Sequence, residues 1–281
     1  KAPQPADPTW EERLAAAGGQ KLIFDVRPSD GICGGAADAK TTSDIVSKRL
    51  NALGLPCGVR YEEGRIHVLC PGMTPADMPK AKSLEVSACL TVRAVDDESD
   101  ALAAPAVAAA MEGKNVTRTA GRSRRLQLES PEPQTLRDVM AKAVLPAGRE
   151  AVIERLGGRS DSPMFASLIL HTDLILSGRS VTGATANEDE MGYPFVRVTV
   201  DAAAAKAFGD FTAANVDKRI AILVDDEVMS TPVIAEAIPG GEFQVSMPKD
   251  GDAKTLAAAM ANRFDAALVF AGAETILPAK K

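Results

Sequence analysis

The sequence contains few of the residues that enzyme active sites usually require. It has 2 histidines and 1 tryptophan among 281 residues, and aromatic residues make up 4% of the chain. It also lacks a GxSxG nucleophile motif, a phosphate-binding glycine loop and a HExxH zinc motif. We therefore expect no enzymatic activity, and we expect the protein to need neither a metal nor a cofactor.

Long apolar runs and surplus positive charge are also missing. No stretch of 18 or more apolar residues occurs, so no segment of this chain is predicted to span a membrane. The formal net charge of −6 argues against a nucleic-acid binder, because phosphate contacts need excess lysine and arginine. The length exceeds the ~100–200 residues of a typical domain, so two packed units are expected.

The most regular pattern in the chain is a strand, a helix and a hairpin in succession. Residues 196–200 alternate valine with polar residues, and Asp201 follows as a helix N-cap. Apolar residues at i, i+3, i+4 and i+7 then predict a helix. Residues 220–224 read as a buried strand that turns back at Asp225 and Asp226.

The helix and hairpin also hold a specific series of side chains. In chain order they are Ala204-Ala205, Phe208, Phe211-Thr212, Asn215, Lys218-Arg219, Ile220 to Val224, Asp225, Val228, Ser230, Pro232-Val233-Ile234 and Gly240-Gly241. This series resembles the head of the large periplasmic domain of SecD, the membrane subunit that assists protein export through the Sec translocon. Asp217 and Asp226 stand where that family usually has glycine. Because aspartate tolerates positive φ better than most residues, the hairpin turn is expected to survive.

Two further stretches carry the same likeness. Residues 174–184 resemble the family's entry into the head, and residues 49–73, RLNALGLPCGVRYEEGRIHVLCPGM, resemble its base subdomain. Residues 99–165 match no pattern of the family. There, the spacing of apolar residues predicts one helix over 136–143 and a second helix that ends at Leu156.

The expected fold class is α+β, with a base subdomain followed by a head subdomain. Predicted strands and helices in the base follow the order β-α-β-β-α-β, which is ferredoxin-like, and its last strand is residues 89–95. A helix followed by a strand is expected to close the head. The expected organisation is a Pro-rich linker at 1–20, the base at 21–98, a helical embellishment at 99–173, the head at 174–277 and a tail at 278–281.

The four cysteines are even in number and have no CxxC spacing, which leaves disulfides or free thiols. If Glu63 and Gly64 form a two-residue turn, Cys57 and Cys70 face each other across the hairpin as a non-hydrogen-bonded pair. The ~4.5 Å expected between their Cα atoms lies within the range that a disulfide needs. We therefore predict a Cys57–Cys70 bond.

The second pair of cysteines follows from the predicted topology. In a ferredoxin-like order the first and last strands are antiparallel neighbours, which brings Cys33, after the first strand, near Cys89, at the start of the last. Of the three possible connectivities, Cys33–Cys89 with Cys57–Cys70 suits this layout. Buried free thiols are the alternative. Persistent disulfides would place the protein in an oxidising compartment, here the periplasm.

The resemblance implies a non-catalytic periplasmic module that binds extended or unfolded polypeptide in protein export, with the Sec translocon or another envelope protein as partner. Strand addition to an exposed sheet edge is a physical route to such binding. Because Pro232 lacks an N–H and suits an edge, residues 227–234 are the candidate edge, with Met229, Thr231 and Val233 as contacts. The opposing interpretation is that Met229 and Val233 complete the core.

A second function is also compatible with the sequence. It is a scaffold that keeps the SecD-like fold, docks on an envelope partner and binds no unfolded clients. The residues linked to proton use in SecD proteins lie in spanning helices. We therefore expect this chain to be either a relative without those helices or a domain cut from a larger protein.

Overall fold

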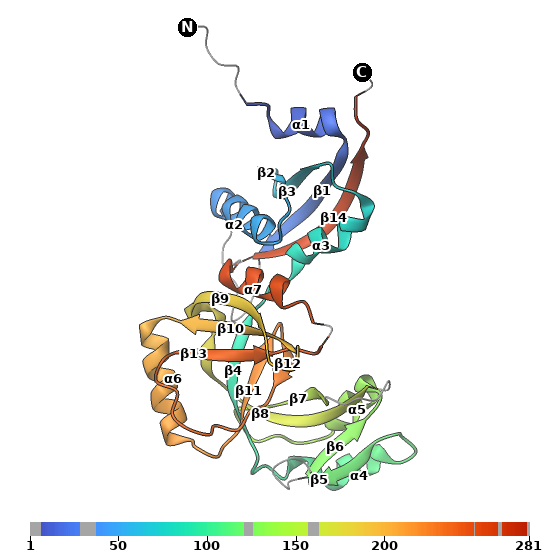
Figure 1. The fold of residues 1–281 in the computed structure, drawn as a ribbon. Coiled ribbons are helices and arrows are strands. Elements are labelled where there is room, and N and C mark those ends of the chain that lie inside the picture. The colour runs from blue at the N-terminus through green and yellow to red at the C-terminus, as the bar shows by residue number, and fades with distance from the viewer. Residues whose placement is uncertain are drawn as a thin grey trace. The chain divides into compact units, whose positions relative to one another are not determined.

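The computed structural model describes residues 7–28, 38–120, 126–156, 163–249, 251–263 and 266–279. The chain divides into two compact units (Figure 1), of which the first comprises Lys1–Ala88 and Lys254–Lys281 and the second Cys89–Ala253. The chain therefore leaves the first unit once, after residue 88, and returns to it once, at residue 254.

The first unit is built on a four-stranded antiparallel sheet in the order β14-β1-β3-β2. Short helices and 3-10 turns complete it. Its elements are α1 (Trp10–Ala17), β1 (Gly19–Pro28), α2 (Ala39–Ala52), β2 (Gly58–Glu62), β3 (Arg65–Pro71), η1 (Pro75–Asp77), α3 (Met78–Lys82), η2 (Ser83–Glu85), α7 (Ala253–Ala261, from Lys254 on) and β14 (Ala266–Ile276).

The strand beside β1 differs from the sequence prediction. We expected residues 89–95 in that place, but β14 pairs with β1 along its whole length, and the predicted strand is β4 (Leu90–Val95) of the second unit. β4 is buried along nearly its whole length and is bonded on both sides, whereas β14 is an edge strand whose second half is largely exposed. The predicted ferredoxin-like base over 21–98 is therefore wrong in its last strand, because residues 90–95 belong to the second unit. The strand that we predicted at the end of the head is β14, which belongs to the sheet of the first unit.

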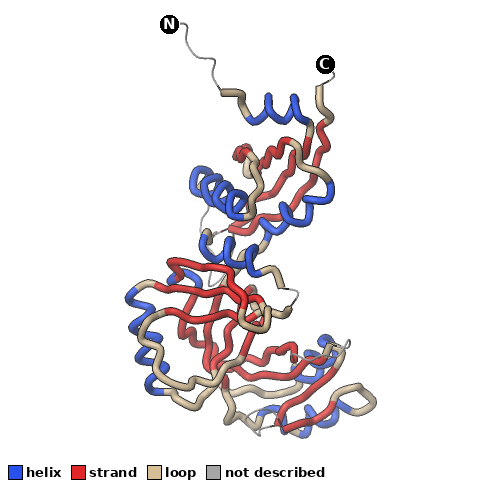
Figure 2. The backbone as a smooth tube through the Cα atoms, in the orientation of Figure 1, coloured by secondary structure: helices blue, strands red, loops and turns tan. Residues whose placement is uncertain are grey.

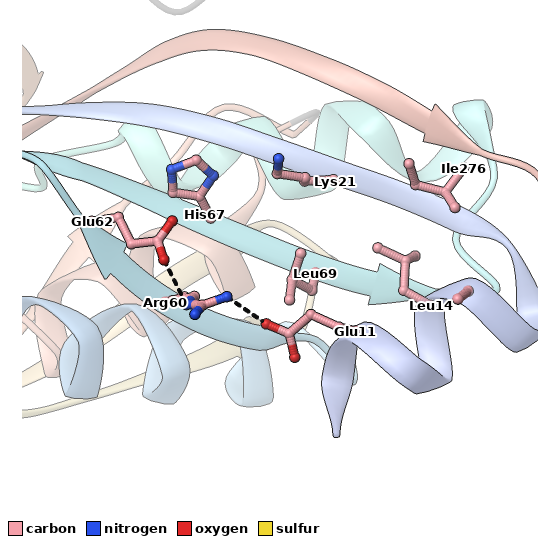
Figure 3. A pocket seen from close by; sticks show the side chains of 9 residues that line it. Glu11, Leu14, Lys21, Arg60, Glu62, His67, Leu69 and Ile276 are labelled. Carbon is pink, nitrogen blue, oxygen red and sulfur yellow. Dashed lines mark hydrogen bonds and ion pairs between the residues drawn. The ribbon is translucent and has the colours of Figure 1, made fainter. Parts of the chain in front are cut away.

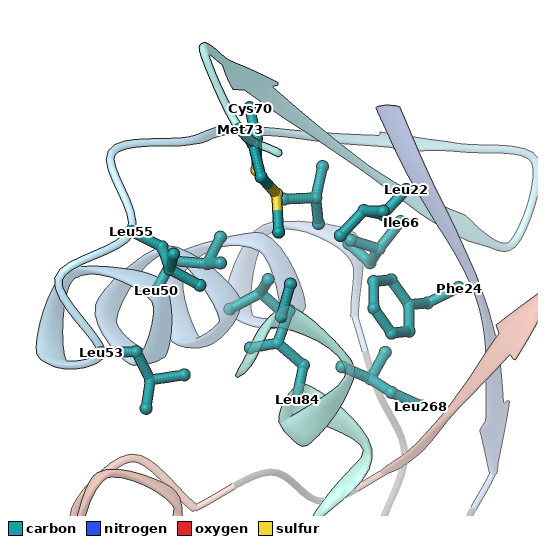
Figure 4. Close-up of a cluster of buried hydrophobic side chains, with 13 residues drawn as sticks. Leu22, Phe24, Leu50, Leu53, Leu55, Ile66, Cys70, Met73, Leu84 and Leu268 are labelled. Atoms are coloured by element: carbon teal, nitrogen blue, oxygen red, sulfur yellow. The ribbon is translucent and has the colours of Figure 1, made fainter. Parts of the chain in front are cut away.

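The core of the first unit lies between its sheet and the helix α2. Leu22 and Phe24 of β1, Ile66 of β3 and Leu50 of α2 are all fully buried, and Leu84 of η2 joins them (Figure 4). Burial of each such side chain contributes about 1.5–3 kcal/mol. The hairpin from β2 to β3 has the predicted register, with Tyr61 opposite Ile66.

The structure contains a helix, α1, within the segment that we predicted to be a linker. Its first turn has a capping box, in which Thr9 Oγ1 accepts a hydrogen bond from the Glu12 N–H (3.2 Å) and Glu12 accepts one from the Thr9 N–H (2.7 Å). Trp10 occupies the space beside Gly58 of β2, where a Cβ atom would lie 2.2 Å from the indole Cγ. The Thr-x-x-Glu spacing was the sequence signal for this helix.

Strands dominate the second unit (Figure 2). Its elements are β4, η3 (Ala101–Ala103), α4 (Pro105–Met111), β5 (Thr117–Ala120), β6 (Leu126–Ser130), α5 (Pro133–Met140), β7 (Arg149–Leu156), β8 (Met164–Ser177), η4 (Gly178–Ser180), β9 (Val181–Glu188), β10 (Pro194–Val200), α6 (Ala202–Ala214), β11 (Ile220–Val224), β12 (Glu227–Ser230) and β13 (Glu242–Ser246).

The larger sheet of this unit closes on itself. Its order is β4-β11-β12-β7-β8-β6-β5, and β4 pairs with β8 as well, so five strands form a ring. All five contribute to one buried cluster, which includes Val95, Leu170, Leu223, Val228 and the partly buried Val152. Side chains from all five strands therefore pack inside the ring, as in small barrels.

Helix α5 packs against strands β6, β7 and β8 of this sheet. Leu128 of β6 and Leu136 and Val139 of α5 are fully buried in a separate cluster. The predicted helix over 136–143 corresponds to α5. The second predicted helix is wrong, because residues 149–156 form strand β7, which pairs with β8 from Arg149 to Leu156.

The smaller sheet of the second unit has three antiparallel strands in the order β13-β10-β9. Val196 and Val198 of β10 and Val245 of β13 are fully buried on one face. Helix α6 covers this sheet through Phe208, whose ring lies 5.7 Å from that of Phe243. The strand, helix and hairpin predicted within residues 195–238 are thus confirmed, and their elements are β10, α6, β11 and β12.

Candidate functional site

The residues that give the sequence its resemblance to SecD mostly hold the second unit together. Asp201 caps α6 by accepting a hydrogen bond from the Ala204 N–H at 2.9 Å. Thr212 is fully buried, and its hydroxyl donates to the Phe208 carbonyl at 2.8 Å and accepts from the Ile238 N–H at 2.9 Å. These contacts fix where the helix begins and how the following loop returns, so the signature describes a fold rather than a reactive centre.

Both departures from the family's glycines lie in the left-handed region. Asp217 has φ 65°, and the turn residues Asp225 and Asp226 have φ 50° and 63°. These values explain why glycine is usual at such positions and why aspartate, which is among the more tolerant residues, is accepted there. Asp225 also accepts a hydrogen bond from the Cys89 N–H at 2.8 Å, which ties the turn to the start of β4.

Two adjacent aspartates after β4 pair with arginines at the start of β7 and just before β11. Asp96 pairs with Arg149 at the start of β7, and Asp97 receives a hydrogen bond from the Arg219 Nε at 3.0 Å. Burial alone would raise the pKa of Asp96, but hydrogen bonds from Arg149 and from the Glu98 and Ser99 N–H groups lower it overall. Asp96 and Asp97 thus act as structural counter-ions to Arg149 and Arg219, which are already ion-paired within the protein.

The candidate contacts Met229, Thr231 and Val233 do not line a sheet edge. β12 (Glu227–Ser230) is bonded to β11 on one side and, at Val228, to β7 on the other, so the predicted edge is wrong for these four residues. Thr231 is buried and its hydroxyl donates to Glu154 at 2.9 Å, whereas Met229 is half-buried and Val233 is 55% exposed. The pattern missed this because β7, the second partner of β12, was read as a helix.

The predicted bond between Cys57 and Cys70 is present, with 4.3 Å between the Cα atoms. It closes the β2–β3 hairpin next to the core of the first unit. The second predicted bond, Cys33–Cys89, lies outside the described residues because Cys33 does. Cys33–Cys89 stays a prediction.

A cavity of about 260 Å³ lies on the outer face of the first unit's sheet, beside α1 (Figure 3). Its floor is apolar, with Leu14, Leu69 and Ile276, and charged side chains surround it. Arg60 bonds both Glu11 (2.9 Å) and Glu62 (2.8 Å). Because these surrounding charges neutralise one another, the cavity presents no surplus charge to a ligand.

Two sheet edges of the described chain are protected at particular residues. On β14, the Phe270 N–H donates to the Glu85 side chain at 2.7 Å, and Lys82 Nζ lies 4.2 Å from the Phe270 ring centroid. β2 is short and carries the ion-paired Arg60. Charged side chains and cover by a neighbouring element are the usual means by which edges avoid pairing with other chains.

β9 is an edge strand that is longer than β2 and carries fewer charged residues. It has eight residues, VTGATANE, of which the last, Glu188, is the only one that is charged. In the described part of the chain, its backbone pairs with β10, and its other side meets no strand. The Asn187 side chain donates a hydrogen bond to the Thr185 carbonyl at 3.1 Å. This bond joins two residues of β9 and involves no other element. An edge of this length with small side chains is accessible to another extended chain.

The loop after β9 presents two apolar side chains in a defined conformation. One carboxylate oxygen of Asp189 accepts hydrogen bonds from the Met191 N–H (2.9 Å) and the Tyr193 N–H (2.8 Å). The Met191 side chain is 77% exposed and Tyr193 is 43% exposed. The loop is thus ordered by its own hydrogen bonds while its apolar side chains remain uncovered.

The described residues include neither a candidate metal site nor a candidate membrane-spanning helix. No group of three or more His, Cys, Asp or Glu side chains among them is placed to hold a metal ion. No helix in the described ranges is both long and apolar enough to cross a membrane.

A family model for the SecDF P1 head subdomain matches residues 154–262. SecD of Acidaminococcus fermentans is 31% identical over 113 residues, which cover 37% of this chain and 27% of that protein. SecD of Calditerrivibrio nitroreducens is 42% identical over 79 residues, or 28% of this chain and 15% of the relative. SecDF of Brucella abortus is 27% identical over 235 residues, which cover 83% of this chain and 25% of that protein. The matched parts thus span about a quarter or less of these relatives.

Two solved structures share the fold. One, described as "a membrane component SecDF that enhances protein export", has a TM-score of 0.54 and 22% identity, and the match covers 90% of this chain and 98% of that one. The other, SecDF in a super-membrane-facing form, has a TM-score of 0.56 and 22% identity over 97% of this chain and 32% of that chain. These structures show a shared fold, and the family-model and sequence matches show similarity to SecD, with the P1 head model matching residues 154–262.

Proposed function

We propose that this SecD-type periplasmic domain binds extended or unfolded polypeptide without catalysis and assists protein export from a periplasmic location. The observation that carries the proposal is the match of residues 154–262 to the SecDF P1 head. Relatives of this segment are named protein translocase subunits, and one related structure is described as enhancing protein export. The Sec translocon is the partner that these names suggest.

The geometry favours a polypeptide ligand over a small molecule. The five-stranded ring is filled by Leu170, Leu223 and their neighbours, and the charges around the cavity of the first unit are ion-paired. What the second unit offers instead is strand edge and exposed apolar side chains. Backbone groups at a sheet edge recognise any extended chain, which suits a protein that handles many clients.

Such binding should be weak. Backbone pairing and a few apolar contacts must offset the entropy of ordering an unfolded chain, so we expect a Kd of roughly micromolar or weaker. Titration of a fluorescein-labelled, reduced and alkylated polypeptide that cannot fold tests this, with the native form of the same polypeptide as control. The unfolded form should bind, and the native form should bind at least ~10-fold more weakly.

The scaffold alternative predicts another result. A domain that docks on a folded envelope partner has no reason to prefer unfolded chains. Absence of binding at hundreds of micromolar, with a natively folded domain, would contradict the proposed function and favour the scaffold.

A further inference from the structure

We propose that the outer edge of β9, together with Met191 and Tyr193 in the loop after it, is the polypeptide-binding site of the second unit. An extended client segment adds to the sheet β13-β10-β9 as a fourth strand beside β9. This inference rests on the proposed function and names its site.

The first argument is hydrogen bonding along β9. In an antiparallel sheet, alternate residues of an edge strand direct their N–H and C=O groups away from the neighbouring strand. β9 spans Val181–Glu188, and its pairing with β10 extends from Val181 to Glu188. Several outward backbone groups are thus available in one row, and three or four hydrogen bonds of ~0.5–1.5 kcal/mol each would hold an added strand.

The second argument is the contrast with the other edges. Glu85 and Lys82 contact β14 at Phe270, and Arg60 lies on the short β2. β9 has glycine, alanine and threonine in its middle, where a bulky or charged residue would impede an incoming chain. Thr182 and Thr185 are exposed there, the other residues of β9 before Glu188 are half-buried, and the side chains are small.

The third argument concerns the side chains that an added segment would meet. Met191 and Tyr193 are exposed, and Asp189 holds their backbone in place, so little ordering entropy is lost when they contact a ligand. Glu188 and Glu190 beside them are also exposed and acidic. The occupant that fits is an extended segment combining apolar and basic side chains.

The experiment uses the full chain and the labelled unfolded polypeptide. Thr185→Lys places a charge on the edge and should raise Kd by at least ~5-fold, and Met191→Ser removes an apolar contact and should raise it by ~5–10-fold. Thr117→Lys on the edge strand β5 and Val144→Ser, at a valine that is 87% exposed, are the matched controls and should leave Kd unchanged.

A peptide pair tests backbone pairing with the unaltered protein. A labelled decapeptide of alternating valine and threonine with a lysine at each end should bind at least ~10-fold more tightly than its analogue with one proline on each edge, because proline has no N–H. Equal binding of the two peptides would overturn strand addition.

The outcomes separate the site from the function. If the unaltered chain binds unfolded polypeptide, and the variants Thr185→Lys and Met191→Ser bind it as tightly as the unaltered chain does, then the proposed site is wrong and the proposed function stands. If the controls weaken binding as much as the β9 variants, the site is also wrong. If the unaltered chain binds nothing, both proposals fail.

Discussion

Arg49 Nε donates a hydrogen bond to the backbone carbonyl of Asn262 at 2.9 Å, and so joins residues 213 positions apart. The same guanidinium donates to the carbonyls of Val86 (2.8 Å), Leu84 (3.2 Å) and Ala259 (3.3 Å). These carbonyls lie in the first unit, beside the two places where the chain passes to the second. Arg49, which is 2% exposed, therefore fastens both connections to the first unit.

Replacing Arg49 by methionine should destabilise the first unit by about 2–4 kcal/mol, because buried carbonyls would lose their donors. Arg60→Met is the control: Arg60 is exposed and pairs with Glu11, so its loss should cost less than about 1 kcal/mol. Urea unfolding followed by fluorescence of Trp10, the single tryptophan, reports on this unit. Equal effects of the two substitutions would contradict a special role for Arg49.

Gly241 and Gly240 should respond very differently to alanine. Gly241 has φ 64°, and an added Cβ would lie 2.5 Å from the Ala205 Cβ, so Gly241→Ala should destabilise the second unit by about 2–4 kcal/mol. A Cβ on Gly240 meets nothing within 4 Å, so Gly240→Ala should change stability by less than about 1 kcal/mol. Urea titrations monitored by circular dichroism measure both, and similar midpoints would refute the packing argument.

Removing the Cys57–Cys70 disulfide should lower the stability of the first unit. The bond spans 13 residues of sequence, and closing a loop of this size stabilises by about 3 kcal/mol on the chain-entropy model. The double variant Cys57→Ala/Cys70→Ala should therefore unfold at lower urea, again read from Trp10. A midpoint unchanged from that of the oxidised parent would show that the hairpin needs no cross-link.

The pH dependence of the second unit should reflect Asp96. Its pKa is lowered below the ordinary 3.8, so its contribution to folding is complete above that pH and is lost as the pH falls through the folded pKa. Asp96→Asn should flatten the stability profile below about pH 4 and lower stability at neutral pH. Asp210→Asn, in the exposed pair with Lys206, should do neither. An acid profile for Asp96→Asn that matches the parent would contradict this assignment.

Local patterns in the sequence predicted much of the fold. The turn at Glu63 and Gly64 set the hairpin register and therefore the Cys57–Cys70 pair, and Asp201 correctly marked the start of α6. These features depend on residues that are close in the sequence. Which strand lies beside β1 cannot be predicted in this way, because β4 and β14 are both apolar strands. Pairing of β1 with β14 joins residues about 250 positions apart, and no local pattern in the sequence indicates such a pairing.

The candidate site was predicted less well, for a related reason. Pro232 suggested an edge at 227–234, but whether a strand is an edge depends on every other strand in its sheet, and β7 had been read as a helix. Only residues 181–184 of β9 belong to the predicted entry to the head at 174–184, and no edge was predicted there. Small residues such as Gly183 and Ala184 give a weak periodic signal, so this edge became evident when the sheet order was known.

Hydrogen exchange of the backbone tests the central claim most directly. With a saturating amount of the unfolded polypeptide, amides within Val181–Glu188 should exchange at least ~10-fold more slowly, because an added strand bonds to them, while amides of the β5 edge, Thr117–Ala120, should not change. Saturated binding with unchanged exchange in Val181–Glu188 would contradict strand addition on β9.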